Sequence, residues 1–307
     1  MSQTAFIFPG QGAQYFGMGR DFYEKCPESA AVFELAEEAC GLPVKRLCFE
    51  ENEQLNITEY TQVCLLATEL AVLKAVAARG FTPCVTAGLS LGEYAALVAA
   101  KKLDMTQALK LVRQRGIYMQ EAVPDGGAMA AVLGLGHEAV ERICAETKGL
   151  VEPANYNCPG QIVISGEVGA VAAAGEAIKA AGAKKVAMLK VSGPFHSSML
   201  SGAGERLAKA LETVVLTDSN IPYVSNTEAE YVTECKAIKP LLIRQVSSAV
   251  RWEQSIRKMI GAGVDTFVEI GPGKTLCGFL KRIDRSVTAI NIDKYEDLDK
   301  LLKIDHK

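Results

Sequence analysis

The stretch CVTAGLSLGEYAALV, residues 84–98, consists of an apolar run, then Gly88-x-Ser90-x-Gly92, then a helix-forming segment that continues to residue 100. This order is typical of a nucleophile elbow, because a serine on a tight turn between a strand and a helix exposes its hydroxyl. The flanking glycines let the backbone pass close to itself. A glycine-rich structural turn would show the same three residues, but the strand and helix signals around them favour the elbow. We therefore expect Ser90 to be a nucleophile.

Strand-like and helical runs alternate on both sides of this unit. Strands are expected at Ala5–Phe8, Thr266–Ile270 and Val287–Ile292, and helices at Ala30–Cys40, Gln62–Arg79, from Met105 to about Gln120, and from the Gly271-Pro272-Gly273 turn through Arg282. Repeated strand-loop-helix units with apolar strands predict a buried, mainly parallel sheet with helices on both faces. The fold class is therefore α/β.

The middle of the chain follows a different order. After a turn at residues 124–127, the pattern predicts a strand at Ala128–Leu133 and a helix at Glu138–Thr147. Two strands on either side of residues 157–160, a helix at Ala170–Ala181 and a strand at Lys185–Val191 follow. This order is that of the split βαβ, or ferredoxin-like, unit. We predict that residues 126–192 form a small inserted subdomain, and that 1–125 and 193–307 form the large one.

Composition excludes several classes of protein. The net charge of −3 gives no basic field for nucleic acid, and 49% hydrophobic residues is ordinary for a globular protein. The nine cysteines form no Cys-x-x-Cys pair, so neither a zinc site nor a disulfide framework is expected. The start has no basic region before its short apolar strand, so no signal peptide is expected, and no window approaches 18 unbroken apolar residues. We expect a cytoplasmic protein with no membrane span.

A serine nucleophile needs a base, which is usually histidine, and the chain has only His137, His196 and His306. His306 stands next to the last residue, and His137 opens a helix of the small subdomain. His196 lies where the chain leaves that subdomain for the large one, and clefts between domains often hold active sites. We therefore favour His196 as the base. A carboxylate could orient this histidine, and spacing does not choose among Asp218, Asp265, Glu269 and Asp293.

Five motifs in order along the chain resemble malonyl-CoA:acyl carrier protein transacylases. They are FPGQGAQ at residues 8–14, GLSLGEY at 88–94, MQEAVP at 119–124, NYNCPGQ at 155–161 and EIGPG at 269–273. The resemblance extends over essentially the whole chain. It implies an α/β-hydrolase-like large subdomain and a ferredoxin-like small one, which agrees with the division drawn from the pattern of elements.

The resemblance also assigns catalytic roles. It makes Ser90 the nucleophile and His196 the base, and Gln245 the residue that orients the histidine through an oxygen acceptor in place of a carboxylate. The backbone N–H groups of Gln11 and Leu91 match the oxyanion hole, where each donor typically lowers a barrier by about 2.7–4 kcal/mol. The residue after an elbow serine is well placed to turn its N–H toward such an oxyanion.

Three further positions match the substrate pocket of these enzymes. Arg115 matches the arginine that holds the malonyl carboxylate, and a guanidinium can bind a carboxylate through two parallel hydrogen bonds. Without the resemblance, Arg115 would be taken for a solvated charge on a helix face. Phe195 leaves little room for a branched α-carbon and so favours malonyl over methylmalonyl groups, and Asn157 resembles part of the pocket wall. The sequence departs from the family at Leu89, where the family has histidine; this leaves open how substrate is positioned or hydrated there.

The reaction that the resemblance implies is transfer of malonyl from malonyl-CoA to the phosphopantetheine thiol of acyl carrier protein, in fatty-acid synthesis. A trans-acting malonyltransferase of polyketide synthesis, a serine thioesterase and a catalytically silent scaffold are the alternatives. The prosthetic arm belongs to the carrier, so no metal or cofactor is expected on this chain. We expect a monomer whose acidic carrier docks on basic residues near the cleft, such as Lys184, Lys185, Arg244 and Arg251.

Overall fold

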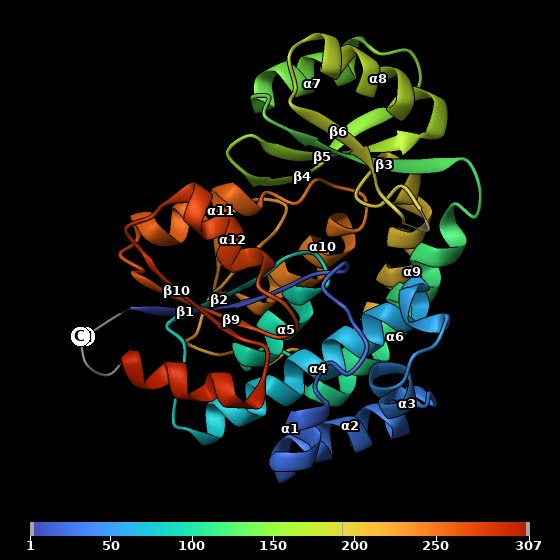
Figure 1. Ribbon diagram of the computed structural model, residues 1–307. Coiled ribbons are helices and arrows are strands. Elements are labelled where there is room, and N and C mark those ends of the chain that lie inside the picture. Colours follow the sequence, from blue (N-terminus) through green and yellow to red (C-terminus); the bar gives the residue numbers. More distant parts are fainter. Residues whose placement is uncertain (1–2, 192, 305–307) are drawn as a thin grey trace.

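The computed structural model describes residues 3–191 and 193–304, and it contains two sheets (Figure 1). The larger sheet has six strands in the order β10-β9-β1-β2-β7-β8. Its members are β1 (Thr4–Phe8), β2 (Val85–Gly88), β7 (Tyr223–Val224), β8 (Tyr231–Val232), β9 (Thr266–Ile270) and β10 (Thr288–Ile292). All neighbouring strands are parallel except β7 and β8. The predicted α/β fold with a mainly parallel sheet is confirmed.

Apolar side chains alternate between the two faces of this sheet. In β1, Phe6 and Phe8 pack into one hydrophobic cluster, while Ala5 and Ile7 pack into another on the opposite face. Both faces are therefore covered by helices, as a parallel sheet requires. The first face carries α1 (Arg20–Lys25), α2 (Pro27–Cys40), α3 (Val44–Phe49), α4 (Thr58–Ala78), α5 (Gly92–Ala99), α6 (Met105–Ala122), α9 (Ser201–Glu212) and α10 (Cys235–Gln245). The second carries α11 (Trp252–Gly261) and α12 (Thr275–Ile283).

Among the described residues, helix α4 is the one helix that is both long and strongly apolar. By length and composition alone it could cross a membrane, but 83% of its most apolar window is buried inside the fold. It packs against α2 and α6, and its residues from Val63 to Leu66 are fully buried. Helix α4 is therefore the central helix of the core.

The smaller sheet has four antiparallel strands in the order β4-β5-β3-β6. Its elements in chain order are β3 (Gly127–Leu133), α7 (His137–Glu146), β4 (Val151–Cys158), β5 (Gln161–Glu167), α8 (Val168–Ala180) and β6 (Lys185–Met188). This is the predicted β-α-β-β-α-β order. Helices α7 and α8 cover one face, and the other face looks toward the larger sheet (Figure 1).

Several boundaries differ from the sequence-based expectation. Strand β6 ends at Met188 rather than Val191, because residues 189–191 leave the sheet and line a cavity. Helix α4 begins four residues before the predicted Gln62. The segment between residues 198 and 261, to which the pattern assigned no elements, holds α9–α11 and β7–β8. The elements of the small sheet lie within the predicted segment 126–192. Met1, Ser2, Ser192 and the last three residues of the chain lie outside the described residues. The subdomain boundaries themselves stay a prediction.

Candidate active site

Ser90 occupies a strained turn between β2 and α5. Its backbone φ is 55°, in the left-handed region that residues with a side chain rarely adopt. Glycine is required on both sides, since a Cβ at Gly88 would collide with the backbone of Gly92, and one at Gly92 would collide with the carbonyl oxygens of Phe8 and Pro9. The Gly88-x-Ser90-x-Gly92 pattern is therefore a true elbow that packs against the end of β1.

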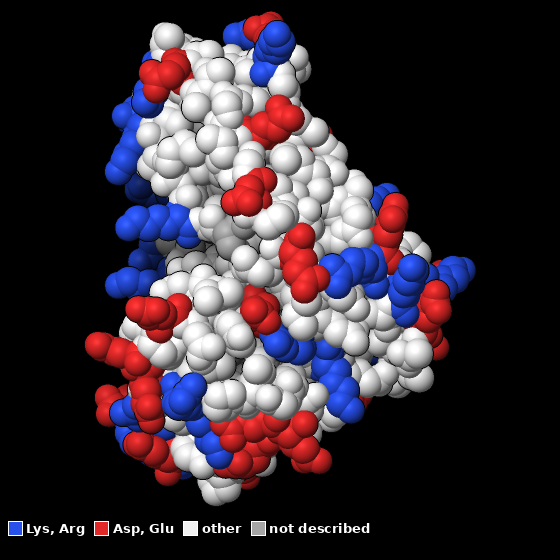
Figure 2. Space-filling model, turned by 90° about the vertical axis from the view of Figure 1, so that its right-hand side faces the viewer, with Lys and Arg blue, Asp and Glu red and all other residues white. Residues whose placement is uncertain are grey.

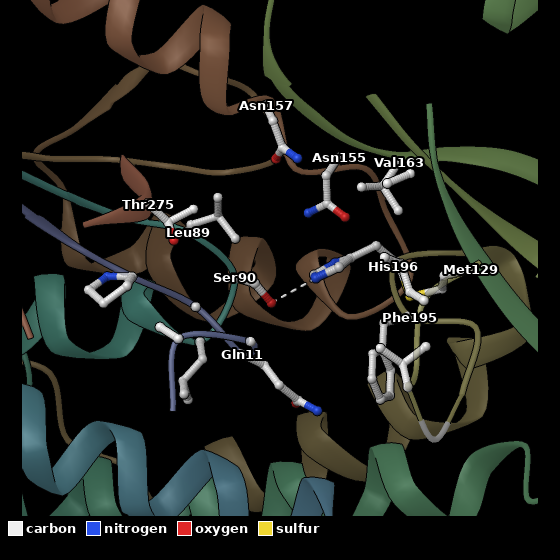
Figure 3. A pocket seen from close by; sticks show the side chains of 18 of the residues that line it. Gln11, Leu89, Ser90, Met129, Asn155, Asn157, Val163, Phe195, His196 and Thr275 are labelled. Carbon is white, nitrogen blue, oxygen red and sulfur yellow. Dashed lines mark hydrogen bonds between the residues drawn. The ribbon is translucent and has the colours of Figure 1, made fainter. Parts of the chain in front are cut away.

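His196 faces the Ser90 hydroxyl from the segment that follows the small sheet. Its Nε2 lies 2.7 Å from Ser90 Oγ, and its Nδ1 lies 2.9 Å from the main-chain oxygen of Gln245 (Figure 3). A carbonyl oxygen can only accept a hydrogen bond, so Nδ1 carries the proton and Nε2 is free to accept one from Ser90. His137, in contrast, lies in α7 with its Nε2 3.7 Å from Glu253, and His306 lies outside the described residues.

The acceptor that orients His196 is a backbone group. Of the four carboxylates that the sequence left open, Glu269 accepts the N–H groups of Leu276 and Cys277 instead and so caps α12. Burial, followed by the positive charge of Arg115, lowers the pKa of His196 to about 4. The imidazole is therefore neutral at neutral pH, which is the state that a general base requires.

Two buried amide side chains fix the elbow. Asn226 Oδ1 accepts the Ser90 N–H at 2.7 Å, while its Nδ2 donates to the Gly88 carbonyl at 2.6 Å. The Gln245 side chain donates from Nε2 to the Ser90 carbonyl at 2.7 Å. Sequence reasoning missed Asn226, which stands just past β7, because a strand of two residues leaves no signal in the sequence.

Arg115 is buried and points at the nucleophile. Its Nη2 lies 3.2 Å from Ser90 Oγ and 2.9 Å from Gln245 Oε1, and its Nη1 donates to Gln62 Oε1 at 2.7 Å. The side chain is 1% exposed, and the Tyr94 ring lies 5.5 Å from its guanidinium carbon. Arg115 forms no ion pair with any carboxylate of the described residues. Reading it as a solvated helix-face charge is therefore wrong; that description fits Arg113, which pairs with Glu59.

These groups surround a cavity of about 400 Å³ between the two sheets. The larger part of the molecule supplies the loop after β1, the elbow, Arg115, and the start of α12 with Thr275. The small sheet supplies Asn155 and Asn157 from β4 and Val163 from β5, which lie above Ser90, and Met129 from β3, which lies beyond His196 (Figure 3). The cavity is lined further by Phe195, Leu89 and Lys190, of which Lys190 is exposed. The fold thus brings together the eight residues that the resemblance assigns to catalysis and substrate binding: Gln11, Ser90, Leu91, Arg115, Asn157, Phe195, His196 and Gln245.

Two backbone N–H groups are available at the elbow. Gln11 stands in the loop after β1, and this loop touches the elbow so closely that a Cβ at Gly10 would lie 2.5 Å from the Leu89 carbonyl oxygen. Leu91 is the residue before α5, at the positive end of the helix dipole. Within residues 3–191 and 193–304, neither the Gln11 nor the Leu91 N–H donates to another group. Both are therefore free to bind an oxyanion.

Leu89 takes the place of the family's histidine and presents an apolar side chain to the cavity. Among the described residues, no group of three His, Cys, Asp or Glu side chains is arranged to hold a metal ion.

Known proteins resemble this chain over nearly its whole length. The acyl transferase domain family matches residues 5–297. A malonyl CoA-acyl carrier protein transacylase of Bacillus subtilis is 46% identical over 304 residues, which covers 97% of this chain and 96% of the relative. The structure of such a transacylase from Clostridium perfringens has a TM-score of 0.95 at 43% identity and covers 99% of this chain and 98% of its own.

A second solved structure is described as a malonyl-transacylase in complex with a type II polyketide synthase acyl-carrier protein. It has a TM-score of 0.96 at 39% identity, and the match covers 99% of this chain and all of that one. Matches of this extent and identity leave no large segment of either chain unaccounted for. The chain belongs to the malonyl CoA-acyl carrier protein transacylase family.

Proposed function

We propose that this chain moves the malonyl group of malonyl-CoA to the phosphopantetheine thiol of acyl carrier protein, in fatty acid synthesis. The observation that carries the proposal is the Arg115 guanidinium, which is buried, contacts no carboxylate of the described residues directly and lies 3.2 Å from the Ser90 hydroxyl. A buried charge without a partner is costly, so a site retains it where a ligand completes the pair. An acyl group that ends in a carboxylate is such a ligand.

In the first half of the reaction, Ser90 Oγ attacks the thioester carbonyl carbon of malonyl-CoA while His196 Nε2 takes the hydroxyl proton. The carbonyl oxygen becomes an oxyanion, which the N–H groups of Gln11 and Leu91 bind. When the tetrahedral intermediate collapses, the carbon–sulfur bond breaks and the CoA sulfur receives the proton from His196. A malonyl ester of Ser90 remains, with the His196 imidazole neutral again.

In the second half, the phosphopantetheine thiol of the carrier enters the same cavity. His196 takes the thiol proton, and the sulfur attacks the ester carbonyl carbon. The second tetrahedral intermediate breaks its bond to Ser90 Oγ, which recovers the proton from His196. The products are malonyl-carrier protein and free enzyme, so one base serves both halves. The phosphopantetheine arm comes with the carrier, and we assign no cofactor to this chain.

The cavity wall sets the choice of acyl group. Arg115 would hold the malonyl carboxylate through its two terminal nitrogens, and a neutral acyl group would leave that cation unpaired. Phe195 is 6% exposed beside His196 and narrows the space for substituents on the α-carbon. Asn155 and Asn157 reach toward the acyl-binding space from β4, where their amides can bind the polar groups of the pantetheine arm (Figure 3).

The test of this function distinguishes a transferase from a thioesterase built on the same groups. The enzyme is incubated with malonyl-CoA, with and without carrier protein that bears phosphopantetheine, and malonyl-carrier and free malonate are quantified. We expect malonyl-carrier to form rapidly and free malonate to appear slowly. Rapid release of malonate that the carrier does not divert would assign the chain to the thioesterases, and absence of both products would assign it to the silent scaffolds.

We also propose where the acidic carrier docks. Figure 2 shows Lys and Arg side chains gathered along one edge of the molecule, beside a hollow between its upper and lower parts. Lys184 and Lys185 are exposed at the start of β6, and Arg251 is exposed before α11. Arg244 is already paired with Glu228, which makes it the weakest of the four predicted docking residues.

Charge reversal tests this docking site. We expect Lys185→Glu combined with Arg251→Glu to raise the KM for the carrier by about three- to tenfold, because rim charges act mainly on association. The KM for malonyl-CoA should stay unchanged. Lys110→Glu, on the exposed face of α6 away from the cavity, is the matched control. An unaltered carrier KM in the double variant would reject this docking site.

We further propose a cytoplasmic monomer in which residues 126–192 form the small subdomain and 1–125 with 193–307 the large one. The separate apolar cluster between the small sheet and helices α7 and α8 supports this division.

A further inference from the structure

Glu93 is a buried carboxyl group that takes no part in the reaction described above. It stands in the first turn of α5, three residues after Ser90, and is 1% exposed. Its Oε2 accepts a hydrogen bond from Gln245 Nε2 at 2.6 Å. Its Oε1 makes no hydrogen bond with any of the described side chains or backbone groups. A buried carboxyl group that is only half satisfied calls for an explanation.

The Gln245 amide connects this carboxyl group to Arg115. Gln245 Oε1 accepts from Arg115 Nη2 at 2.9 Å, and Nε2 of the same amide donates to Glu93. An amide has one donor end and one acceptor end, and Nε2 donates both to Glu93 and to the Ser90 carbonyl, so these two acceptors dictate which end faces the guanidinium. A reversed amide would point its NH₂ group at the Arg115 cation. Glu93, together with the Ser90 carbonyl, therefore keeps the Gln245 oxygen directed at Arg115, and Glu93 is the member of this pair that carries charge.

We propose that Glu93 is a positioning residue for acyl selection: through the Gln245 amide it holds the Arg115 guanidinium toward Ser90, and it serves as the internal counter-charge of Arg115 while the cavity lacks an acyl carboxylate. The inference rests on the proposed function, because it takes Arg115 as the group that binds the malonyl carboxylate.

The role of Glu93 as a counter-charge predicts that substrate binding is coupled to proton uptake. Burial raises the pKa of Glu93 to about 7, against the opposing effects of the Gln245 side chain, the Asn226 main chain and the Arg115 charge, in that order. Near neutral pH the carboxyl group is therefore partly ionised. A malonyl carboxylate at Arg115 would add a second negative charge to the same buried network, which favours the protonated form of Glu93. Binding of malonyl-CoA should then take up a fraction of a proton.

The other titratable groups around Glu93 do not change their protonation near pH 7. Tyr94 on α5 and Tyr223 on β7 both have pKa values raised by burial, so they stay neutral at neutral pH. His196, with a pKa of about 4, is neutral there as well. Arg115, on α6, is the cation of the network. Proton uptake centred near pH 7 is therefore a signature of Glu93.

The experiment measures equilibrium binding to a Ser90→Ala variant, which cannot be acylated. Titration calorimetry in two buffers of different ionisation enthalpy gives the number of protons taken up, for malonyl-CoA and for acetyl-CoA. We expect uptake with malonyl-CoA, centred near pH 7, and none with acetyl-CoA. The dissociation constant for malonyl-CoA should rise by up to roughly tenfold between about pH 6 and pH 8, as Glu93 ionises.

Glu93→Gln, added to Ser90→Ala, separates this role from a structural one. The new amide keeps an oxygen for Gln245 but carries no charge, so binding of malonyl-CoA should become independent of pH and take up no proton. Glu69→Gln is the matched control, since Glu69 is equally buried on α4 and senses no charge of Arg115. We expect this control to keep the uptake.

The inference about Glu93 and the proposed function fail on different results. If malonyl-CoA binds more tightly than acetyl-CoA but with no proton uptake near pH 7 in the Ser90→Ala variant, the inference about Glu93 is overturned and the proposed function stands. Uptake that persists in the Glu93→Gln variant overturns it equally. If malonyl-CoA binds no more tightly than acetyl-CoA, the proposed function fails, and the inference fails with it. Should the Glu93→Gln variant not fold, the measurement on Ser90→Ala alone still decides.

Discussion

Replacing Ser90 with alanine is expected to lower malonyl transfer to the carrier by about 10⁴- to 10⁶-fold, because both halves of the reaction pass through its oxygen. The fold should not change, since the main-chain bonds from Ser90 to Asn226 and Gln245 do not involve the hydroxyl. The measurement is the initial rate of malonyl-carrier formation, with thermal unfolding as the check on folding. Ser201→Ala, at an exposed serine of α9, is the control and should keep full activity.

His196→Ala should cost a comparable factor, and the double variant should be hardly worse than either single one. Nucleophile and base act as a unit, so their losses do not add. Losses that multiplied in the double variant would contradict a shared role for the 2.7 Å contact between Ser90 Oγ and His196 Nε2.

Arg115→Ala is expected to lower kcat/KM for malonyl-CoA by roughly 30- to 5,000-fold. This range corresponds to about 2–5 kcal/mol, the cost of removing one member of a buried charge pair. The rate with acetyl-CoA should not fall, because a neutral acyl group gains nothing from the cation. The enzyme should therefore lose its preference for malonyl groups. The ratio of the two kcat/KM values is the quantity to measure.

Two neighbouring substitutions sharpen this prediction. Arg113→Ala, two residues away on α6, removes a partly exposed ion pair with Glu59 and should leave the ratio unchanged. Arg115→Lys keeps the charge but loses the planar fork, so it should recover only part of the preference. Equal losses with malonyl-CoA and acetyl-CoA in Arg115→Ala would show that Arg115 supports the fold rather than the substrate.

The elements that the sequence predicted well are those whose apolar pattern is long and clearly bounded. Strand β9 has the predicted ends at Thr266 and Ile270, since an apolar run there precedes a Gly-Pro-Gly turn. Strands β7 and β8 are two residues long, which is too short to produce a pattern. The predicted strand at 185–191 was too long because Leu189 and Val191 are apolar for another reason: they line the cavity.

The candidate site could be predicted in part for similar reasons. Ser90 has a local signature, and elimination among three histidines leads to His196. The burial of Arg115 has no local signature, because it depends on α4, α5 and α10 packing around one face of α6. Asn226 and Glu93 were missed because their roles arise only from contacts between segments more than a hundred residues apart.

The most direct test of the account is the mass of the enzyme after brief exposure to malonyl-CoA without carrier, followed by peptide mapping. We predict one added malonyl group, located on Ser90, that disappears when carrier bearing phosphopantetheine is added and malonyl-carrier appears in equal amount. A protein that stays unmodified, or one modified at a residue other than Ser90, would contradict transfer through a malonyl-serine ester.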